Sequence, residues 1–346
     1  MSAQPQVKCV VWDLDNTLWE GTLLEGDDVK LRPGVLDVVE ELDARGILQA
    51  VASRNDHEHA WAKLVELDVA RYFVEAEIGW GPKSGAVRRI ADRLRFDVGT
   101  LAFVDDRPTE RAEVAHHLPS VRCYTDEDVA TLLARPEFTP AVVTADARSR
   151  RLMYLANSER TAAKEEFTGS DDDFLRTLEL VLRIDHAREE DLARVEELTL
   201  RTSQMNATGV HYSDTTLRTM LADPGHAVLV VAMEDRFGSH GAVGIVLLER
   251  RPGRWRIKLL ATSCRVVAFG AGAVLLNWLV DQAARAGVGL EADFRATDRN
   301  RMMEIAYRFA GFTDAAETTE DGVQRLAVTP ERRPAPTAIT LSAPEL

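Results

Sequence analysis

This sequence of 346 residues has no long apolar run and no export signal. No apolar stretch approaches the roughly 18–20 residues that a membrane-spanning helix needs. The first residues, MSAQPQVKCVVWDL, show no basic segment that leads into an apolar one. Membrane insertion and export are therefore not expected, and we expect the protein to be cytoplasmic.

Paired cysteines are also missing. Cys9, Cys123 and Cys264 show no CxxC spacing, so a disulfide scaffold and a structural zinc site are excluded and free thiols are expected. Aromatic residues make up only 6% of the chain, but 45% of it is hydrophobic, which excludes a wholly disordered protein. At about 100–200 residues per domain, the length predicts two soluble domains.

Basic residues are outnumbered, because 42 Lys and Arg face 56 Asp and Glu, for a net charge of −14. A general nucleic-acid binder presents a basic surface to the phosphates, so this class of protein is excluded. A local basic patch remains compatible with the composition. Arg148, Arg150 and Arg151 form one on a predicted helix, either as a solvated face or as a contact for an acidic partner protein.

Residues 1–125 alternate short apolar runs with amphipathic stretches, beginning with KCVVWDL and VLDVVEELDARG. This rhythm predicts an α/β domain with a parallel sheet and right-handed crossovers. In such sheets the functional side chains lie at the carboxyl ends of the strands. We therefore expect Asp13, Ser53 and Asp105, which end three predicted strands, to lie together.

The remainder of the chain divides into three parts. Residues 126–178 lack strand signals and contain helical segments, so they are predicted to form a helical connector. Residues 179–327 combine helices with strands that are joined partly by hairpin-length turns, which predicts a mixed, largely antiparallel sheet. The tail, residues 328–346, is rich in Pro and Ala without periodicity and is predicted to be disordered.

The segment VVWDLDNT places Asp13 and Asp15 directly after an apolar strand. Taken alone, it is either an acidic turn or a cation site, since crowded carboxylates are costly without a cation. Ser53, Lys83 and the pair Asp105–Asp106 follow in order at later strand or loop ends. This fuller set favours magnesium-assisted phosphoryl transfer.

Each member of the set has a predicted role. Mg²⁺ prefers oxygen ligands, and the predicted metal-ligating residues are Asp13, Asp15, Asp105 and Asp106. An ionised Asp13 can attack phosphorus to give an aspartyl phosphate, while Asp15 protonates the leaving oxygen and then activates water. The remaining phosphoryl oxygens are expected to be held by Thr17, Ser53, Arg54, Asn55 and Lys83.

Together, DLDNT, the Ser53 strand end, Lys83 and VDD resemble the four motifs of the haloacid dehalogenase-like phosphohydrolase superfamily. Many members insert a cap domain between the first three motifs. Here the stretches from Thr17 to Ser53 and from Ser53 to Lys83 leave room only for a helix and its loops. The resemblance therefore implies an uncapped Rossmann-like domain, whose open site admits a large or protein-borne substrate.

The loop SCRVVAFGAGA, between an apolar strand and an amphipathic helix, is either a simple turn or an anion site built from main-chain N–H groups. Downstream, DRNRMMEIAYRFAGF resembles the second half of the GCN5-related acyltransferase (GNAT) signature. Ala268 stands at the first glycine position of that fold's R-x-x-G-x-G pattern, a departure that disfavours tight coenzyme A binding. The resemblance implies a GNAT-like α+β domain. Its implied acyl- or phosphopantetheine-binding residues are Cys264, Arg265, Gly270, Gly272, Asn300, Tyr307 and His211.

The two parts in combination resemble the FkbH-like family of polyketide assembly over residues 7–315, through segments such as RTSQMNATGVHYS and EDRFGSHGAVGIVL. This resemblance implies Mg²⁺ as cofactor and 1,3-bisphosphoglycerate as substrate. The glyceryl group, freed of phosphate, would be loaded on the phosphopantetheine thiol of an acyl carrier protein.

Two departures from that family keep alternatives open. Ala52 replaces the cysteine that commonly precedes the serine of the second motif, and RTSQMN replaces the more usual RTNQFN. If a cysteine carries the acyl group, Cys264 is a better candidate than Cys9, which lies deep in a predicted strand. The alternatives are a phosphatase of a small phosphorylated metabolite with a vestigial second domain, and a non-catalytic module that docks a carrier protein.

Overall fold

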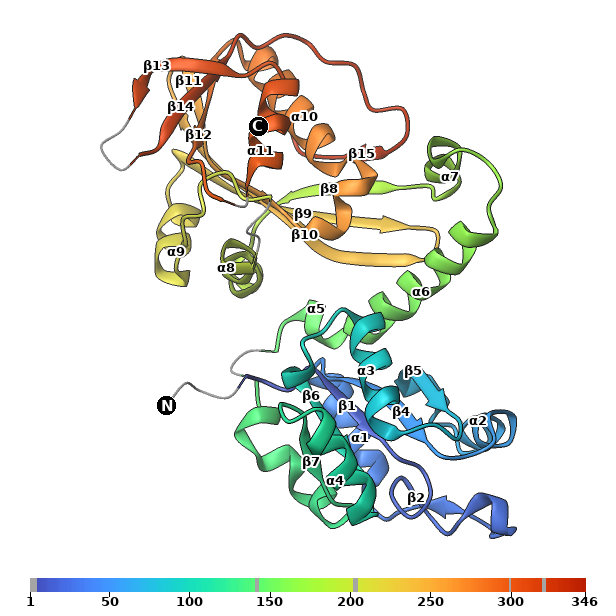
Figure 1. Cartoon of the computed structure of the whole chain (residues 1–346). Helices are drawn as coiled ribbons and strands as arrows, with labels where there is room; N and C mark the ends of the chain where they lie inside the picture. The colour runs from blue at the N-terminus through green and yellow to red at the C-terminus, as the bar shows by residue number, and fades with distance from the viewer. Residues whose placement is uncertain (1–4, 141–142, 202–204, 299, 319–321) are drawn as a thin grey trace. The chain divides into compact units, whose positions relative to one another are not determined.

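The computed structural model describes residues 5–140, 143–201, 205–298, 300–318 and 322–346 (Figure 1). The chain divides into two compact units, Met1–Leu155 and Ala156–Leu346. The division falls inside helix α6 (Arg150–Glu166), within the predicted helical connector. In the ranges given above, no helix is long and apolar enough to cross a membrane.

The first unit is built on a five-stranded parallel sheet, which confirms the predicted α/β class. In spatial order the strands are β5 (Phe73–Ile78), β4 (Leu48–Ser53), β1 (Cys9–Trp12), β6 (Leu101–Val104) and β7 (Arg122–Tyr124). The register pairs Trp12 with both Val51 and Val104, so the carboxyl ends of the three central strands meet at one edge. Strand β5 was not predicted, because its glutamates interrupt the apolar pattern of FVEAEI.

Helices cover both faces of this sheet (Figure 1). Successive strand residues point to opposite faces, and one face packs with α1 (Val35–Ala44) and α2 (His57–Glu66). The other packs with α3 (Lys83–Leu94) and α4 (Pro108–His117). Between Thr17 and α1 the chain forms only a short hairpin and a 3₁₀ turn, named β2 (Trp19–Glu20), η1 (Leu23–Glu25) and β3 (Lys30–Leu31). No cap domain is inserted there.

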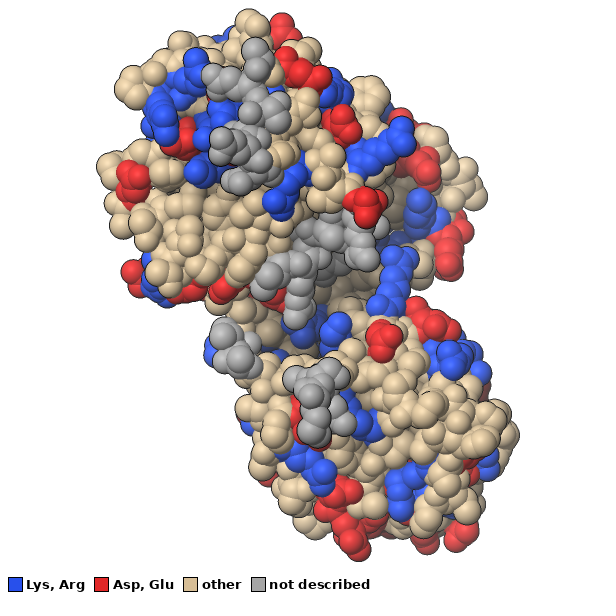
Figure 2. Space-filling model, turned by 60° about the vertical axis from the view of Figure 1, so that its left-hand side comes forward, with Lys and Arg blue, Asp and Glu red and all other residues tan. Residues whose placement is uncertain are grey.

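The predicted basic patch is largely used inside this unit. Arg150 donates to the carbonyl of Gly46 at 2.7 Å, and Arg151 pairs with Asp43 at 2.9 Å. These two arginines therefore hold the start of α6 on the first unit. On the face drawn in Figure 2, acidic and basic side chains are interspersed over each unit.

The second unit contains an eight-stranded mixed sheet, as predicted. Its ladders are antiparallel except for β11–β12 and β8–β15. In spatial order the strands are β13 (Thr313–Thr318), β14 (Gln324–Val328), β12 (Gly289–Phe294), β11 (Arg254–Thr262), β10 (Gly238–Arg251), β9 (His226–Asp235), β8 (Val181–His186) and β15 (Thr340–Ser342).

Helices also cover both faces of the second sheet. One face packs against α10 (Ala271–Ala286) and α11 (Arg301–Phe309), and the other against α8 (Leu192–Arg201) and α9 (Asp214–Ala222). Helix α7 (Asp171–Thr177) precedes β8, and the 3₁₀ turns η6 (Glu189–Asp191) and η7 (Cys264–Phe269) precede α8 and α10. In the first unit the chain also forms η2 (Ala70–Tyr72), η3 (Val98–Thr100), η4 (Glu127–Ala134), η5 (Pro136–Phe138) and α5 (Ala145–Arg148).

The tail is ordered, contrary to the disorder expected for residues 328–346. Its strand β15 pairs in parallel with β8, and Ile339 is buried just before it. Arg332 binds the carboxylate of Asp281 on α10 at 2.7 Å. The tail is therefore held by the edge of the sheet and by α10. Both partners lie far from the tail in the sequence, so the composition of this Pro-rich segment does not reveal them.

Candidate functional site

Three carboxylates meet at the carboxyl edge of the first sheet. Asp13 follows β1, and Asp105 and Asp106 follow β6. Each offers one oxygen atom, and these three oxygens all lie within 4.8 Å of one another. Asp13 and Asp105 are buried and Asp106 is half-buried, so the sheet holds negative charge in a place with little water. Three hard oxygen donors at this spacing fit a divalent cation such as Mg²⁺.

Lys83 balances part of this charge. Its ammonium group, at the start of α3, lies within hydrogen-bond distance of Asp13 Oδ1, and it donates to Asp105 Oδ2 at 3.0 Å and to the Ala52 carbonyl at 2.7 Å. The lysine side chain is 4% exposed. Among the described residues Asp13 Oδ2 has no hydrogen-bond partner, which leaves that oxygen available to a substrate.

The electrostatics follow from burial. Loss of water, and then the nearby charge of Asp13, raise the pKa of Asp105 to about 6, although Lys83 opposes the shift. Desolvation, followed by the charge of Asp13, also raises the pKa of Asp106. Both carboxyls bind protons more tightly than usual, as expected where anions are crowded for a cation to bind.

Asp15 does not lie in the three-carboxylate group, although it was predicted to ligate the metal. Its Oδ1 accepts hydrogen bonds from Trp19 Nε1 at 2.8 Å and from the Leu23 main-chain N–H at 3.0 Å. Its Oδ2 accepts from Asn55 Nδ2 at 3.0 Å. These donors fix the carboxylate in one orientation, which suits an acid–base group better than a ligand side chain.

The predicted phosphate-binding residues separate into two kinds. Ser53 and Lys83 line a cavity of about 80 Å³, together with the end of β5 (Glu77 and Ile78) and with Gly79, Gly81 and Pro82 of the loop that leads into α3. Thr17 instead accepts from the main-chain N–H of Asp106 at 3.0 Å, and Arg54 pairs with Glu110 at 2.9 Å. Asn55 holds Asp15, as described above. The structure therefore puts Ser53 and Lys83 at the cavity and gives the other three residues supporting contacts.

Sequence reasoning missed several contributors to this site. Trp19 and Leu23 orient Asp15, and Glu110 fixes Arg54. Gly79 and Gly81 line the cavity, and a side chain added at either would meet open space. The spacing of Asp15 and Trp19 was the available signal for the role of Trp19, since the tryptophan follows Asp15 by only four residues.

A different arrangement occurs in the second unit, where β11 and β12 diverge. Their parallel pairing ends at Ile257–Ala292, whereas β11 continues to Thr262 and β12 to Phe294. Residues 205–207 lie in the gap: the Ala207 N–H donates to the Leu260 carbonyl at 3.0 Å, and the Arg295 N–H donates to the Ala207 carbonyl at 3.0 Å. We call residues 205–209 the inserted segment.

A family model described as haloacid dehalogenase-like hydrolase matches residues 21–117. A curated relative, magnesium-dependent phosphatase 1 from Homo sapiens, is 32% identical over 127 residues, which cover 31% of this chain and 72% of the relative. The chain belongs to the haloacid dehalogenase-like hydrolases. This hydrolase is therefore an enzyme, and the family match lies within its first unit.

Two solved structures similar to this hydrolase each match less than half of its chain. One is the N-terminal part of BF1531 from Bacteroides fragilis, which contains a phosphatase domain complexed with Mg: it is 24% identical, has a TM-score of 0.31, and the match covers 43% of this chain and 40% of that one. Another is the ribosomal-protein-S18-alanine N-acetyltransferase from Escherichia coli, 16% identical with a TM-score of 0.34, over 44% of this chain and 97% of that one.

The predicted acyl-site residues of this hydrolase fall in different places. Gly270 caps the N-terminus of α10 with a φ of 76°, and Gly272 lies in its first turn. Asn300 is buried, and its side-chain amide donates hydrogen bonds to the main-chain carbonyls of Asn206 and Arg295, at 2.9 Å each. His211 contacts Thr199 at 3.1 Å and Glu196 at 3.4 Å. The side chains of Cys264 and Arg265 lie outside the described structure.

Tyr307 is fully buried against the rings of Phe294 and Phe312, and its hydroxyl has no hydrogen-bond partner among the described residues. Desolvation raises the pKa of this phenol. A buried donor without a partner costs free energy, and a bound ligand that supplied an acceptor would relieve that cost.

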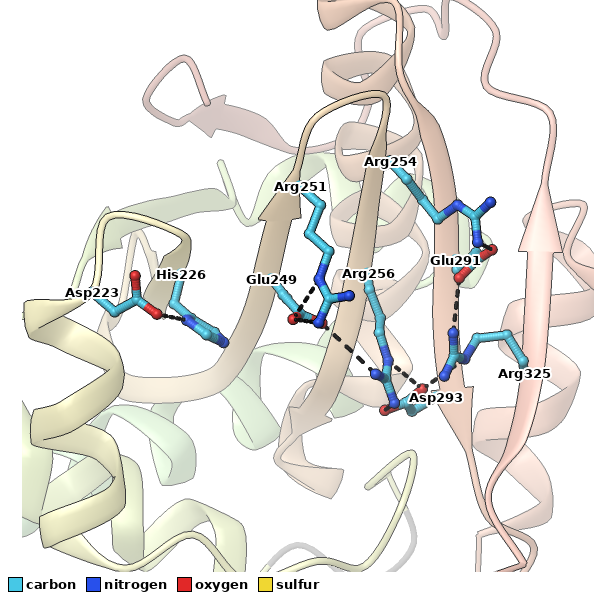
Figure 3. Close-up of polar contacts among 9 residues, drawn as sticks. All are labelled: Asp223, His226, Glu249, Arg251, Arg254, Arg256, Glu291, Asp293 and Arg325. Atoms are coloured by element: carbon cyan, nitrogen blue, oxygen red, sulfur yellow. Dashed lines mark hydrogen bonds and ion pairs between the residues drawn. The ribbon is translucent and has the colours of Figure 1, made fainter. Parts of the chain in front are cut away.

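A charged network on the α8/α9 face of the second sheet is shown in Figure 3. Three of the four carboxylates drawn each lie between two arginines, and the fourth, Asp223, pairs with His226 at 2.7 Å. Asp293 bridges Arg256 and Arg325, at 2.7 and 3.1 Å. In the same way, Glu249 pairs with Arg251 and Arg256. Glu291 pairs with Arg254 and Arg325. Since every arginine drawn has an acidic partner, the network joins strands together and does not form an open anion site.

Proposed function

We propose that this hydrolase removes phosphate from a three-carbon acyl substrate with Mg²⁺ at Asp13, Asp105 and Asp106, and that its second unit passes the acyl group to a carrier protein. The cluster of three carboxylates around Lys83, beside an oriented Asp15, carries the first half of the proposal. The Mg in one similar solved structure and in the name of the human relative agrees with it.

The residues assign the two chemical steps. Asp13 Oδ2 attacks phosphorus, so an O–P bond forms as the bond to the leaving oxygen breaks, and Asp15 gives that oxygen its proton. Asp15 then takes a proton from water, whose oxygen attacks the aspartyl phosphate and releases Asp13 and inorganic phosphate. Ser53 and Lys83 hold the phosphoryl oxygens. Mg²⁺, when bound, neutralises charge on the carboxylates and on the phosphoryl group.

The finer proposal is that the substrate is 1,3-bisphosphoglycerate, whose 3-phosphate ester is hydrolysed at Asp13. The phosphopantetheine thiol of an acyl carrier protein attacks the acyl carbon, so a C–S bond forms as the C–O bond to the 1-phosphate breaks and that phosphate leaves. The resemblance of residues 7–315 to the FkbH-like family supports it. An uncapped site also suits a protein-borne group, and Trp80 stands 70% exposed on the loop that lines the cavity beside Lys83. Exposed aromatic side chains are frequent contacts for partner proteins.

The test combines purified protein, Mg²⁺, 1,3-bisphosphoglycerate and a holo acyl carrier protein. Intact-mass spectrometry of the carrier should show one added glyceryl group, and phosphate should be released. Asp13→Asn should leave the carrier without a dephosphorylated glyceryl group and should abolish hydrolysis of the 3-phosphate, whereas Asp28→Asn, a change at an exposed surface carboxylate of the same unit, should alter neither. A carrier that stays unloaded with the active protein overturns the proposal.

A second candidate function is the hydrolysis of a small phosphorylated metabolite, without transfer by the second unit. Ala52 favours it, because no cysteine stands beside Ser53 to accept an acyl group. Phosphate release that is equally fast with and without a carrier protein would support this candidate.

A further inference from the structure

The inserted segment acts as an additional strand between the diverging ends of β11 and β12. On one side the Ala207 N–H donates to the Leu260 carbonyl at 3.0 Å, and the Thr262 N–H donates to the Met205 carbonyl at 2.8 Å. Asn206 and Ala261 are directly opposite in this antiparallel bridge. The edge of β11 beyond Ile257 is thus occupied by the chain itself.

The other side of the inserted segment is held by residues that follow β12. The Arg295 N–H donates to the Ala207 carbonyl at 3.0 Å, and Arg295 Nε donates to the Thr208 carbonyl at 2.8 Å. Asn300 donates to the Asn206 carbonyl at 2.9 Å. Asn300, which was predicted to bind an acyl donor, therefore binds the chain's own backbone.

The inserted segment is held by polar contacts and by burial in the apolar core of the second unit. Asn206 Oδ1 accepts from the N–H groups of Thr208 and Gly209, at 3.1 and 2.7 Å, and so forms the turn that ends the segment. In the sequence MNATG only Met205 has a large apolar side chain. Residues 205–208 are buried, and Met205 and Ala207 belong to the apolar core of the second unit. The segment therefore leaves only when an incoming chain covers the same surface and replaces its hydrogen bonds.

We propose that the inserted segment is a self-docked latch, which an extended, amide-bearing arm must displace in order to lie along β11. The inference rests on the acyl-transfer half of the proposed function. A phosphopantetheine arm carries two amides. These amides can pair with the Leu260 carbonyl and the Thr262 N–H, the two main-chain groups that the latch now occupies. Two chains cannot pair with one strand edge at once.

The position of the latch agrees with this competition. A Cβ added at Gly272, in the first turn of α10, would lie 3.7 Å from Met205 Cε. The latch therefore begins next to the N-terminus of α10, which is where the dipole of the helix favours a phosphate. An arm that starts from a phosphate at that end and runs along β11 meets Met205 first and then Ala207.

The apparent affinity for the arm is proportional to the fraction of molecules in which the latch is open, so a mostly closed latch weakens binding. Ala207→Pro tests this, because proline removes the N–H that donates to Leu260 while the edge of β11 stays intact. Calorimetric titration with coenzyme A, used as a probe that bears the arm, should show about three- to tenfold tighter binding to Ala207→Pro than to the wild type, the range expected for one lost hydrogen bond. Ala335→Pro, in the tail between two prolines, is the matched control and should bind like the wild type.

Hydrogen exchange on the wild-type protein provides a measurement that needs no variant. Saturating coenzyme A should increase exchange at residues 205–209 and keep Thr262 protected, because the arm replaces the latch as its partner. The inference is refuted if coenzyme A binds while the protection of the latch is unchanged. It is also refuted if Ala207→Pro binds coenzyme A no more tightly than the wild type, or if neither protein binds it. A carrier that is loaded while the latch stays closed refutes the latch alone. Tightened binding without carrier loading refutes the proposed function alone.

Discussion

Replacement of Lys83 by methionine should separate the structural role of this residue from its catalytic one. Methionine keeps a similar length and apolar stem but removes the ammonium group that lies between Asp13 and Asp105. The two carboxylates are then left buried beside each other without a cation. In the absence of a metal ion, we therefore expect a large loss of stability in the first unit.

The magnitude follows from the burial of the three side chains, none of which is more than 9% exposed. Removing one partner of a buried ion pair costs about 3–5 kcal/mol. For a unit of this size, each kcal/mol lowers the melting temperature by about 2–4 °C, so the expected decrease is about 6–20 °C. Saturating Mg²⁺, at about 100 times its Kd, would restore about 2.7 kcal/mol by binding only the folded state.

The assay is calorimetric unfolding with EDTA and with Mg²⁺, alongside phosphate release. Lys63→Met is the matched control, since Lys63 pairs at 2.8 Å with the exposed carboxylate of Glu66 and should cost less than about 1 kcal/mol. Lys83→Met should also lose phosphate release. The reasoning is refuted if the metal-free Lys83→Met protein melts with the wild type, or if saturating Mg²⁺ does not raise the melting temperature of Lys83→Met.

Three further predictions concern other contacts. Lowering the pH through about 6 should weaken Mg²⁺ binding, because burial and a neighbouring carboxylate raise the pKa of Asp105 to about 6 and a protonated carboxyl is a poor ligand; equal affinities by titration calorimetry at pH 5 and pH 7 would contradict this. Arg160→Met should destabilise the second unit by about 3–5 kcal/mol in denaturant unfolding, since it leaves the carboxylate of Asp235 buried without its bidentate partner. Arg176→Met, at an exposed ion pair, is the control, and equal effects would be evidence against the reasoning. Deletion of residues 339–346 should lower the melting temperature of the second unit, because it removes β15 and the buried Ile339, worth about 1.5–3 kcal/mol; an unchanged melting curve would count against it.

The sequence predicts best those elements whose patterning is local. Strands β1, β4 and β6 are short runs buried on both faces, and each ends at a polar residue that the sheet brings to a common edge. Asp13, Ser53 and Asp105 could be grouped in advance for this reason. Strand β5 was missed because it lies at the edge of the sheet, where its glutamates are tolerated.

The remaining features depend on partners far away in the sequence. The latch pairs Ala207 with Leu260, and no local signal in MNATG indicates a strand. The tail is ordered by Asp281 and by the edge of β8, neither of which its composition reveals. Asp15 was assigned to the metal from its neighbourhood to Asp13, but the N–H groups of Trp19 and Leu23 determine where its carboxylate lies.

The parallel pairing of β15 with β8 has a consequence during synthesis. Residues 1–155 form a compact unit that can fold as soon as they leave the ribosome, but β15 is made about 190 residues later. At about 5–20 residues per second this delay lasts about 10–40 s. For most of that interval β8 has an unpaired edge, which is open to pairing with other nascent chains. Expression at lower protein concentration, or with chaperones that cover exposed strands, should therefore raise the yield of soluble protein.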